Sequence, residues 1–496
     1  MEYISTRGES APVKAAEAIK KGIAPDGGLF LPAADVSIPV KDYMKNLSYS
    51  ELAAEIIAEY LTDYSKEEIL KAAKAAYGPE KFDNPSVTPL HIISPSQYFL
   101  ELWHGPTCAF KDMALQLLPH LLTEAVKKCG EDTGVFILVA TSGDTGKAAL
   151  EGFRDINGTR IAVFYPDHGV SEVQKRQMVT QEGDNVSVIA VEGNFDDAQS
   201  AVKQVFADKS IAAITSEKGY RFSSANSINW GRLVPQIVYY YRAYIELLKN
   251  GLIMDGEKIN FVVPTGNFGN ILAAFYARAA GLPINRLICA ANSNNVLTDF
   301  TITGSYNRKR PFIKTISPSM DILISSNLER LLFELTHRNA GLVATWMREL
   351  NENGNYTVDE VTAAKIRELF WSASADDEAT IKAIRRYYKE HSYLMDTHTA
   401  VAAEVYNRYL KETCDQTKTV IVSTANPYKF NKSVAKAVLS PEDTAEKDEF
   451  ALLKLLESKT GLKIPAPLKN LEKKEIIHTA TIKKEEIKDA VVKIIT

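Results

Sequence analysis

The stretch VFILVATSGDTGKAAL, residues 135–150, decides the fold class of this chain. Val135 to Ala140 are apolar without interruption, which predicts a short strand that is buried on both faces. Thr141 to Gly146 are small or polar residues, and the alanines that follow Lys147 favour a helix. A buried strand that leads through a glycine loop into a helix is typical of a parallel sheet covered by helices.

The same order of strand, loop and helix recurs along the chain. Further short apolar runs predict buried strands at residues 161–165, 186–191, 259–263, 287–291 and 419–422. We therefore predict an α/β fold in which parallel twisted sheets are flanked by helices. Apolar periodicity predicts helices at residues 50–60 and 66–77, in a helical N-terminal piece, and in two charged segments at residues 360–391 and 440–456.

The composition of the 496 residues excludes several kinds of partner. The 58 lysines and arginines nearly balance the 62 aspartates and glutamates, so the net charge of −4 favours neither nucleic acid nor an anionic membrane. No apolar run approaches the roughly 20 residues of a membrane-spanning helix. The 4 cysteines lack a Cys-x-x-Cys pair, which argues against a disulfide framework and a zinc site and favours a reduced, cytoplasmic location.

Two glycine loops are candidate anion sites. The loop at residues 141–146 would present backbone N–H groups at a helix N-terminus, with the hydroxyls of Thr141, Ser142 and Thr145 as further donors. A plain tight turn with a capping threonine explains this loop equally well. The second loop follows the predicted strand at 259–263 and consists of Gly266, Asn267, Phe268, Gly269 and Asn270. Neither loop matches the Walker A or the dinucleotide-binding pattern.

Lys111 stands out in the segment HGPTCAFKD, residues 104–112. The positive end of a helix dipole and the apolar neighbours Ala109 and Phe110 both lower the pKa of an amine at this position. A lowered pKa suits a lysine that forms a Schiff base. The simpler alternative is a surface lysine whose aliphatic stem packs on Phe110.

Together these motifs resemble the threonine synthase family, which are pyridoxal-phosphate enzymes with the tryptophan synthase β-type fold. The resemblance lies in HGPTCAFKD (104–112), ATSGDTG (140–146), PTGNFGN (264–270), STANPYKF (423–430) and the opening segments YISTRG (3–8) and APDGGLFLP (24–32). It implies a fold type II architecture with two lobes. We predict a mainly helical N-terminal domain at 1–90, an α/β core that depends on pyridoxal phosphate at 91–345 with a smaller mobile lobe near 130–240, and the rest of the large lobe with a helical C-terminal extension at 346–496.

The resemblance also implies how pyridoxal 5′-phosphate is held. Lys111 would form the Schiff base with the cofactor and, once released, would carry out both proton abstractions. Thr424 would face the pyridine nitrogen. Asp144 would lie near the 3-oxygen of the cofactor, where many relatives have asparagine, so a hydrogen bond there would depend on protonation. The cofactor phosphate would be bound by Gly266, Asn267, Phe268, Gly269 and Asn270.

The resemblance further implies a substrate with a phosphate group. Ser227 and Arg232, in NSINWGR (226–232), match residues that contact the phosphate of O-phospho-L-homoserine, although an ordinary helix-surface arginine remains the alternative. Thr141, Ser142 and Thr145 would bind the anionic groups of the substrate.

The implied reaction converts O-phospho-L-homoserine and water into L-threonine and phosphate by γ-elimination and β-addition of water, as in a carbon–oxygen lyase of threonine biosynthesis. Three alternatives stay open. Two use the same scaffold: a phospho-lyase that gives 2-oxobutyrate, and a threonine or serine dehydratase. The third is a non-catalytic binding protein that keeps the phosphate loop.

The remaining candidates are assigned structural roles. We expect His398 to cap or pack and His104 to be a structural histidine bonded to backbone, and we expect no metal site. The tyrosines at 239–241 should pack in the core or at a domain surface. The small-molecule substrate is the expected partner of a chain that is a monomer or a homodimer.

Overall fold

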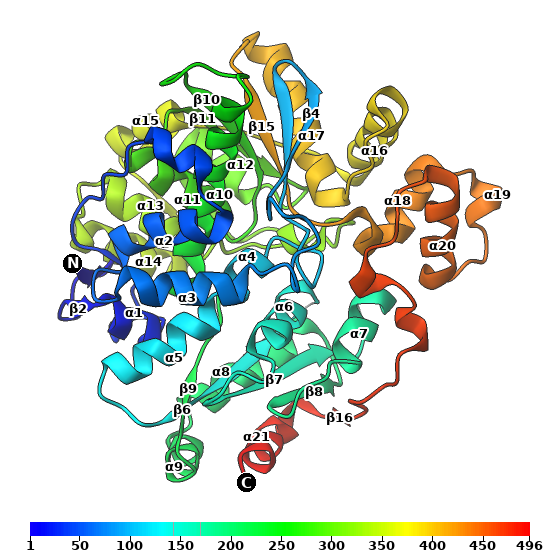
Figure 1. Cartoon of the computed structure of the whole chain (residues 1–496). Helices are drawn as coiled ribbons and strands as arrows, with labels where there is room; N and C mark the ends of the chain where they lie inside the picture. The colour runs from blue at the N-terminus through cyan, green and yellow to red at the C-terminus, as the bar shows by residue number, and fades with distance from the viewer. Residues whose placement is uncertain (142, 169) are drawn as a thin grey trace.

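The computed structural model describes residues 1–141, 143–168 and 170–496. Two sheets form two lobes, the larger at the top of Figure 1 and the smaller at the bottom. In the larger sheet the strands lie in the order β14 (Phe370–Ser374), β11 (Ile284–Ala291), β10 (Ile259–Pro264), β15 (Thr419–Ser423), β5 (Gln97–Glu101) and β4 (Leu90–Ser94). In the smaller sheet the order is β16 (Thr481–Ile482), β8 (Val186–Val191), β7 (Thr159–Pro166), β6 (Gly134–Ala140) and β9 (Tyr220–Ser223). Strand β4 pairs antiparallel with β5, and the other neighbouring strands of both sheets are parallel.

The uninterrupted apolar runs are explained by burial on two faces. In β10, Phe261 and Val263 pack into the core that contains α10 (Trp230–Lys249) and α11 (Gly269–Ala279). The intervening Val262 packs into a second core with α17 (Thr397–Thr413). Successive side chains of a strand point to opposite faces, so a strand with helices on both sides is apolar at most of its positions. The predicted α/β class with helix-flanked sheets in two lobes is confirmed.

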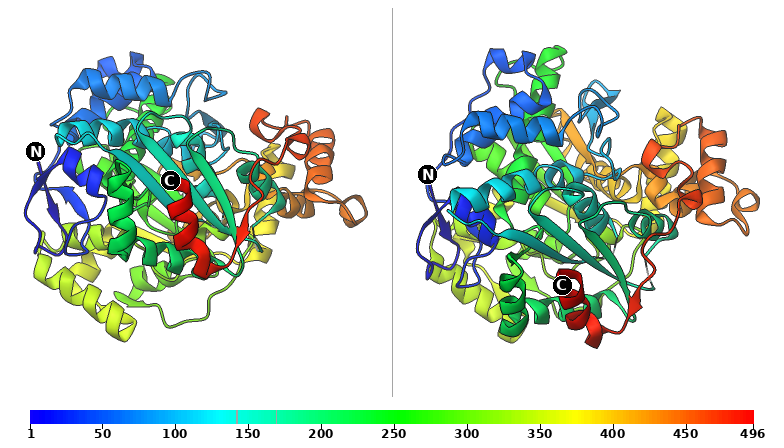
Figure 2. Two further views of the ribbon diagram at one scale, coloured as in Figure 1. Left: turned by 90° about the horizontal axis from the view of Figure 1, so that it is seen from below. Right: turned by 60° about the horizontal axis from the view of Figure 1, so that its bottom comes forward.

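The smaller lobe contains the glycine loop of residues 141–146. Its sheet is covered by α6 (Asp144–Phe153) and α7 (Glu172–Val179) on one side, and the other side carries α8 (Phe195–Ala207) and α9 (Lys209–Glu217). The last strand, β16, joins the edge of this sheet, where Ile482 pairs with Val191. Helix α21 (Ile487–Ile495) then packs against α8 and α9, so the C-terminus lies beneath the smaller lobe (Figures 1 and 2).

The N-terminal piece combines helices with a small sheet. Strands β2 (Val13–Lys14), β1 (Glu2–Ser5) and β3 (Phe30–Pro32) form an antiparallel sheet beside α1 (Ala15–Lys21). The expected helices appear as α2 (Tyr49–Tyr60) and α3 (Lys66–Ala76). Ser48 and Ser65 begin these two helices with capping boxes, each of which stabilises a helix by about 0.5–2 kcal/mol.

Residues 360–391 do not form one helical segment as predicted. Helix α15 (Glu360–Leu369) ends where β14 begins, and α16 (Asp377–His391) follows the strand. The prediction failed in the middle because β14 is a short edge strand in which two serines and an alanine follow Phe370 and Trp371, so it lacks the apolar run of a central strand. Residues 440–456 are likewise divided, between α19 (Pro441–Thr444) and α20 (Glu449–Thr460).

The other elements connect these layers. They are α4 (Asp112–Leu115), α5 (Leu118–Lys128), α12 (Val296–Thr303), the hairpin strands β12 (Ser305–Asn307) and β13 (Asn355–Thr357), α13 (Leu328–Leu335), α14 (Ala340–Asn353) and α18 (Asn431–Val438). Short 3-10 helices include η3 (Pro427–Phe430) and η5 (Leu471–Lys473). Within the described ranges, every helix is too short or too polar to cross a membrane.

Candidate active site

The segment that carries Lys111 is held against the end of β15. The backbone N–H of Phe110 donates to the carbonyl of Thr424 at 2.8 Å, and Asn426 donates to the carbonyl of Cys108 at 3.0 Å. Lys111 follows this contact directly and is the N-cap residue of α4, as the sequence predicts. The C-terminal end of a parallel strand is where open α/β sheets bind their ligands. The fold therefore places Lys111 at the C-terminal end of β15.

The ammonium group of Lys111 faces residues from both lobes. Lys111 Nζ lies 3.1 Å from Ser319 Oγ and 3.4 Å from Asp144 Oδ2, and its side chain is 11% exposed. Burial lowers the pKa of Lys111, Asp144 opposes this shift, and the cations Lys429 and Arg232 reinforce it. The alternative of a surface lysine is therefore wrong. A lysine amine that loses its proton more readily is a better nucleophile toward an aldehyde.

Asp144 is the counter-ion at the centre of the site. Its Oδ1 accepts from Gln174 Nε2 at 2.8 Å and lies 2.7 Å from Lys429 Nζ, whereas its Oδ2 accepts from Ser319 Oγ at 3.3 Å. Burial disfavours the charged carboxylate, but Lys429 and Lys111 outweigh it and hold the pKa of Asp144 well below its usual range. The carboxylate is therefore ionised and acts here as an acceptor.

The glycine loop at 141–146 is closed by its own threonine. Thr141 Oγ1 accepts from the N–H groups of Gly143 at 3.0 Å and Gly146 at 2.9 Å. Thr141 therefore caps the turn, as the alternative of a plain tight turn predicts. Its hydroxyl hydrogen is still able to donate to a ligand. Thr145 lies half-buried in the first turn of α6, and Ser142 lies outside the described residues. Their contacts with substrate stay predictions.

The loop of residues 266–270, which is the predicted phosphate site and is called the cradle below, connects β10 with α11. Phe268 adopts the left-handed conformation with φ of 65° as the N-cap of α11, so the chain turns sharply onto the helix N-terminus. A Cβ atom on Gly266 would stand 2.9 Å from the carbonyl oxygen of Ser319. Glycine is therefore needed where this loop meets the segment that contacts Lys111.

Two tyrosines orient the last residue of the cradle. The hydroxyls of Tyr239 and Tyr240, on α10, each lie 2.6 Å from Asn270 Oδ1. Both tyrosines are fully buried, as expected for core residues. Asn270 Nδ2 is buried and has no hydrogen-bond partner among the described residues. A helix N-terminus with a spare amide donor suits a bound phosphate group.

Thr424 and His398 belong to a polar network behind Lys111. The backbone N–H of Thr424 donates to Thr399 Oγ1 at 3.2 Å, and the Thr424 side chain is 5% exposed. His398 Nε2 accepts from the backbone N–H of Ser319 at 3.1 Å, so its Nδ1 carries the hydrogen and donates to Asp396 Oδ1 at 2.9 Å. His398 therefore positions the segment of Ser319, while Asp396 caps α17.

Ser227 and Arg232 also converge on the site. Ser227 Oγ lies 3.4 Å from Ser326 Oγ, beside the cradle. Arg232 is 4% exposed and donates from Nη1 to the carbonyl of Ala225 at 2.8 Å, while its Nε is buried without a partner in the described chain. Burial lowers the pKa of Arg232 to about 10. Arg232 is therefore not the helix-surface residue of the alternative interpretation.

Pyridoxal phosphate, which the sequence motifs imply, fits these residues. The site combines a buried amine of lowered pKa at Lys111 with a helix N-terminus and a spare amide donor at Asn270. The amine suits the aldehyde of the cofactor and the helix N-terminus suits its phosphate. No cluster of three or more His, Cys, Asp or Glu side chains in the described ranges is placed to hold a metal ion.

Sequence reasoning missed several residues of the site. Ser319 and Gln174 stand in no recognisable motif, and Lys429 lies in the segment STANPYKF without a predicted role of its own. Their only signal is the fold itself, which brings them to Asp144 from distant parts of the chain. The expected backbone partner of His104 was also wrong, because its ring nitrogens contact Asp83 Oδ1 at 2.6 Å and Glu101 Oε2 at 2.9 Å.

Known proteins resemble the whole chain. The family described as "Pyridoxal-phosphate dependent enzyme" matches residues 86–425, "Threonine synthase N terminus" matches 2–77, and "Threonine synthase, C-terminal" matches 399–491. The threonine synthase of Pseudomonas aeruginosa is 40% identical over 88% of this chain and 90% of its own. The crystal structure of PLP-bound threonine synthase from Brucella melitensis superimposes with a TM-score of 0.88 at 34% identity, covering 100% of this chain and 99% of that one.

A second group of relatives is longer. The human protein called threonine synthase-like 1 is 39% identical over 85% of this chain, but the match spans only 58% of the human protein. The matches to the three family descriptions together, and to the bacterial relative, cover most of this chain, so the chain belongs to the threonine synthase family of pyridoxal-phosphate-dependent enzymes.

Proposed function

We propose that this protein converts O-phospho-L-homoserine and water into L-threonine and phosphate. The observation that carries the proposal is Arg232, a buried guanidinium with an unpartnered Nε and no anionic partner among the described residues. Buried charges in proteins are normally paired, so this guanidinium is suited to an anionic ligand. A phosphate group on the substrate supplies that charge and matches the forked donors of arginine.

The position of Arg232 supports the same assignment. Its charge lowers the pKa of Lys111, so the two cations lie near each other. Ser227, which lies just before the N-cap of α10, adds a hydroxyl beside the cradle. A substrate that reaches both Lys111 and Arg232 carries its amino group at one end and its phosphate at the other, which is the arrangement in phosphohomoserine.

In the mechanism we propose, Lys111 is the group that moves protons. The cofactor, when bound, withdraws electrons from the substrate and so stabilises negative charge on its carbon atoms. Lys111 Nζ would remove the protons from Cα and Cβ, return one to Cγ after phosphate has left, and return the other to Cα once water has added at Cβ. The proton that water releases would go to the departed phosphate. Ser319 and Asp144 contact Lys111 Nζ at 3.1 and 3.4 Å and would orient its lone pair toward the substrate.

The two lobes would control access of water. Asp144 belongs to the smaller lobe, and its partners Lys429 and Ser319 belong to other parts of the chain. Movement of the loop at 141–146 over bound substrate would exclude bulk water during elimination. One water molecule must then add at Cβ to give threonine. Thr141 and Thr145 are proposed to bind the substrate in this closed state.

The four free thiols favour a cytoplasmic location.

The decisive experiment measures three products at once. Purified protein with pyridoxal phosphate is incubated with O-phospho-L-homoserine, and phosphate, threonine and 2-oxobutyrate are quantified. Equimolar phosphate and threonine are expected. Phosphate with 2-oxobutyrate as the main organic product would instead assign the protein as a phospho-lyase. Turnover of threonine or serine without use of phosphohomoserine would indicate a dehydratase.

A further inference from the structure

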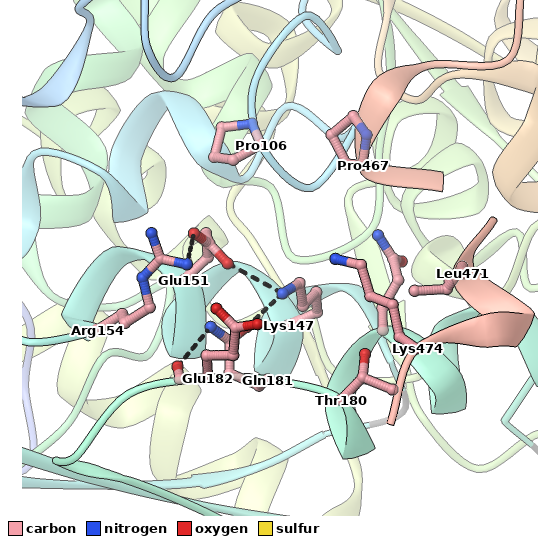
Figure 3. A pocket seen from close by; sticks show the side chains of 11 residues that line it. Pro106, Lys147, Glu151, Arg154, Thr180, Gln181, Glu182, Pro467, Leu471 and Lys474 are labelled. Carbon is pink, nitrogen blue, oxygen red and sulfur yellow. Dashed lines mark hydrogen bonds and ion pairs between the residues drawn. The ribbon is translucent and has the colours of Figure 1, made fainter. Parts of the chain in front are cut away.

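A cavity of about 180 Å³ lies beside the active site but shares none of the residues that contact Lys111. It is enclosed by one face of α6, by α7 with the residues just after it, and by the C-terminal segment, residues 467–474 (Figure 3). Pro106, in the loop that leads to Lys111, lines its other side. Four separate parts of the chain therefore meet around one polar space.

A buried lysine supplies positive charge to this cavity. The Lys147 side chain is 10% exposed, and its Nζ lies 3.0 Å from Glu151 Oε2 and also contacts Gln181 Oε1. Glu151 is shared, because its Oε1 lies 3.2 Å from Arg154 Nη1. One carboxylate thus serves two cations. Since an ammonium group has three N–H donors, Lys147 has one donor left for a ligand.

A buried amide faces the same space without a partner. Gln177 is 2% exposed and lines the cavity, and neither its Oε1 nor its Nε2 has a hydrogen-bond partner in the described part of the chain. Buried amides are nearly always hydrogen-bonded, so this one points to a bound molecule or water. Lys474 also lines this cavity (Figure 3) and forms no ion pair with a described residue.

We propose that this cavity binds a compact oxyanion, of the size of inorganic phosphate or a small carboxylate. The lining carries three cations, at Lys147, Arg154 and Lys474, against two carboxylates, at Glu151 and Glu182. The unused donors are those of Lys147, Lys474 and the Gln177 amide, and all three suit an anionic acceptor. The volume is below the roughly 300–1,000 Å³ of pockets for larger organic ligands, so a small anion with its waters fits.

An anion at this position would connect the C-terminal segment to the smaller lobe. Lys474 belongs to the segment, whereas Lys147 and Gln177 belong to α6 and α7. Helix α6 begins at Asp144, so the same helix carries both the counter-ion of Lys111 and the cation of this cavity. The inference does not depend on the reaction proposed above, because it concerns residues outside the active site.

The test is phosphate binding to the holoenzyme, measured by isothermal titration calorimetry. Wild-type protein is expected to show a phosphate site that Lys474→Ala weakens at least about tenfold, the change expected when one charged partner of an anion is removed. Lys473→Ala, which removes an exposed lysine outside the cavity, is the matched control and should bind phosphate as the wild type does. The same titration with acetate shows whether phosphate or a carboxylate is preferred.

A second variant tests the buried side of the cavity. Gln177→Leu removes the amide while keeping a similar volume, and it should also weaken phosphate binding without changing the visible spectrum of the bound cofactor. Lys474 is exposed, so Lys474→Ala gives a folded protein in any case. Wild-type affinity for both phosphate and acetate in Lys474→Ala would overturn the proposal. Equal weakening in Lys473→Ala would also overturn it, because it would indicate only general attraction to a basic surface.

Discussion

Lys429 Nζ lies 2.7 Å from Asp144 Oδ1, with side-chain exposures of 0% and 5%. This ion pair joins the segment after β15 to the first turn of α6 and so connects the two lobes at the active site. Lys429 also donates to the carbonyl of Thr107 at 2.8 Å. Because one carboxylate faces two lysines, the charge of Lys429 compensates Asp144 even when Lys111 has lost its proton.

Lys429→Met is expected to destabilise the protein strongly. The change leaves the buried Asp144 carboxylate without its closest cation, and breaking a buried ion pair costs about 3–5 kcal/mol. Urea unfolding of the apoprotein measures this loss directly. Lys429→Arg keeps the charge and should retain more stability than Lys429→Met.

Asp144→Asn provides the double-mutant control. In the Lys429→Met/Asp144→Asn protein neither charge is left unpaired, so the stability loss should be clearly smaller than the sum of the two single losses. Additive losses would show that the two side chains do not interact energetically. Lys429→Met should also raise the pKa of Lys111, since the charge of Lys429 lowers it. In the holoenzyme Lys111 Nζ would belong to the imine, so the pKa of the free amine is measured on the apoprotein. The pH dependence of the rate at which the apoprotein takes up pyridoxal phosphate should shift toward alkaline pH.

Lys111→Ala should abolish covalent attachment of the cofactor. Borohydride reduction of the wild-type holoenzyme followed by peptide mapping should place the modified lysine at position 111, and activity of the variant should fall by at least about 10²–10⁴-fold. Lys128→Ala, at the end of α5, is the control. A modified peptide that contains Lys429 or Lys147 would contradict the assignment, because these are buried lysines near the same site.

The fold was largely predictable because burial on two faces leaves a strong signal in the sequence. The runs that became β6, β7, β8, β10, β11 and β15 are apolar at most of their positions, as central parallel strands require, and Ser187 in β8 and Asn260 in β10 are the polar residues inside them. Strands β14 and β16 were missed because they lie at sheet edges and are short. The domain boundaries after residues 90 and 345 stay predictions. The pairing of β16 with β8 joins positions about 290 residues apart and has no local signature.

The active site was predictable only where residues follow strands in motifs. A glycine loop or a helix start is visible in the sequence at Lys111, Asp144 and the cradle, so these residues could be predicted as candidate site residues. The partners of Lys111 and Asp144 could not, because Ser319 is 208 residues from Lys111 and depends on His398 for its position. Tertiary contacts of this kind follow from the packed fold and not from spacing along the chain.

Arg232→Gln should impair use of phosphohomoserine while the cofactor remains bound. Removing one partner of a buried charge pair costs about 2–5 kcal/mol, so kcat/KM should fall by about 30-fold or more. Arg242→Gln is a matched control, because Arg242 is a buried arginine on the same helix whose partners are Glu246 and the carbonyl of Leu47. Unchanged kinetics in Arg232→Gln would remove this residue from the substrate site.

His104 should make stability depend on alkaline pH. Burial alone would lower the pKa of His104, but hydrogen bonds to Asp83 and Glu101 outweigh it and raise the pKa to about 9. The folded state therefore holds a proton that the unfolded chain releases near pH 6.5, so the stabilisation is complete below that pH and is lost as the pH rises through about 9. Urea midpoints between pH 6 and pH 10 measure the loss. His104→Gln should flatten this dependence, whereas His168→Gln, at a side chain that is 91% exposed, should leave it as in wild type.

Gly266→Ala tests the contact between the cradle and the segment of Ser319. The added Cβ would stand 2.9 Å from the carbonyl oxygen of Ser319 and 3.2 Å from Cα of Met320. Both atoms belong to the backbone, so neither can rotate away as a side chain could. We expect weaker binding of pyridoxal phosphate and a lower thermal midpoint of the holoenzyme, because the segment that contacts Lys111 must shift. Gly341→Ala, in α14, meets nothing nearer than 3.7 Å and should stabilise by about 0.4–1 kcal/mol. Wild-type cofactor affinity in Gly266→Ala would show that the two segments need not approach as closely as they do here.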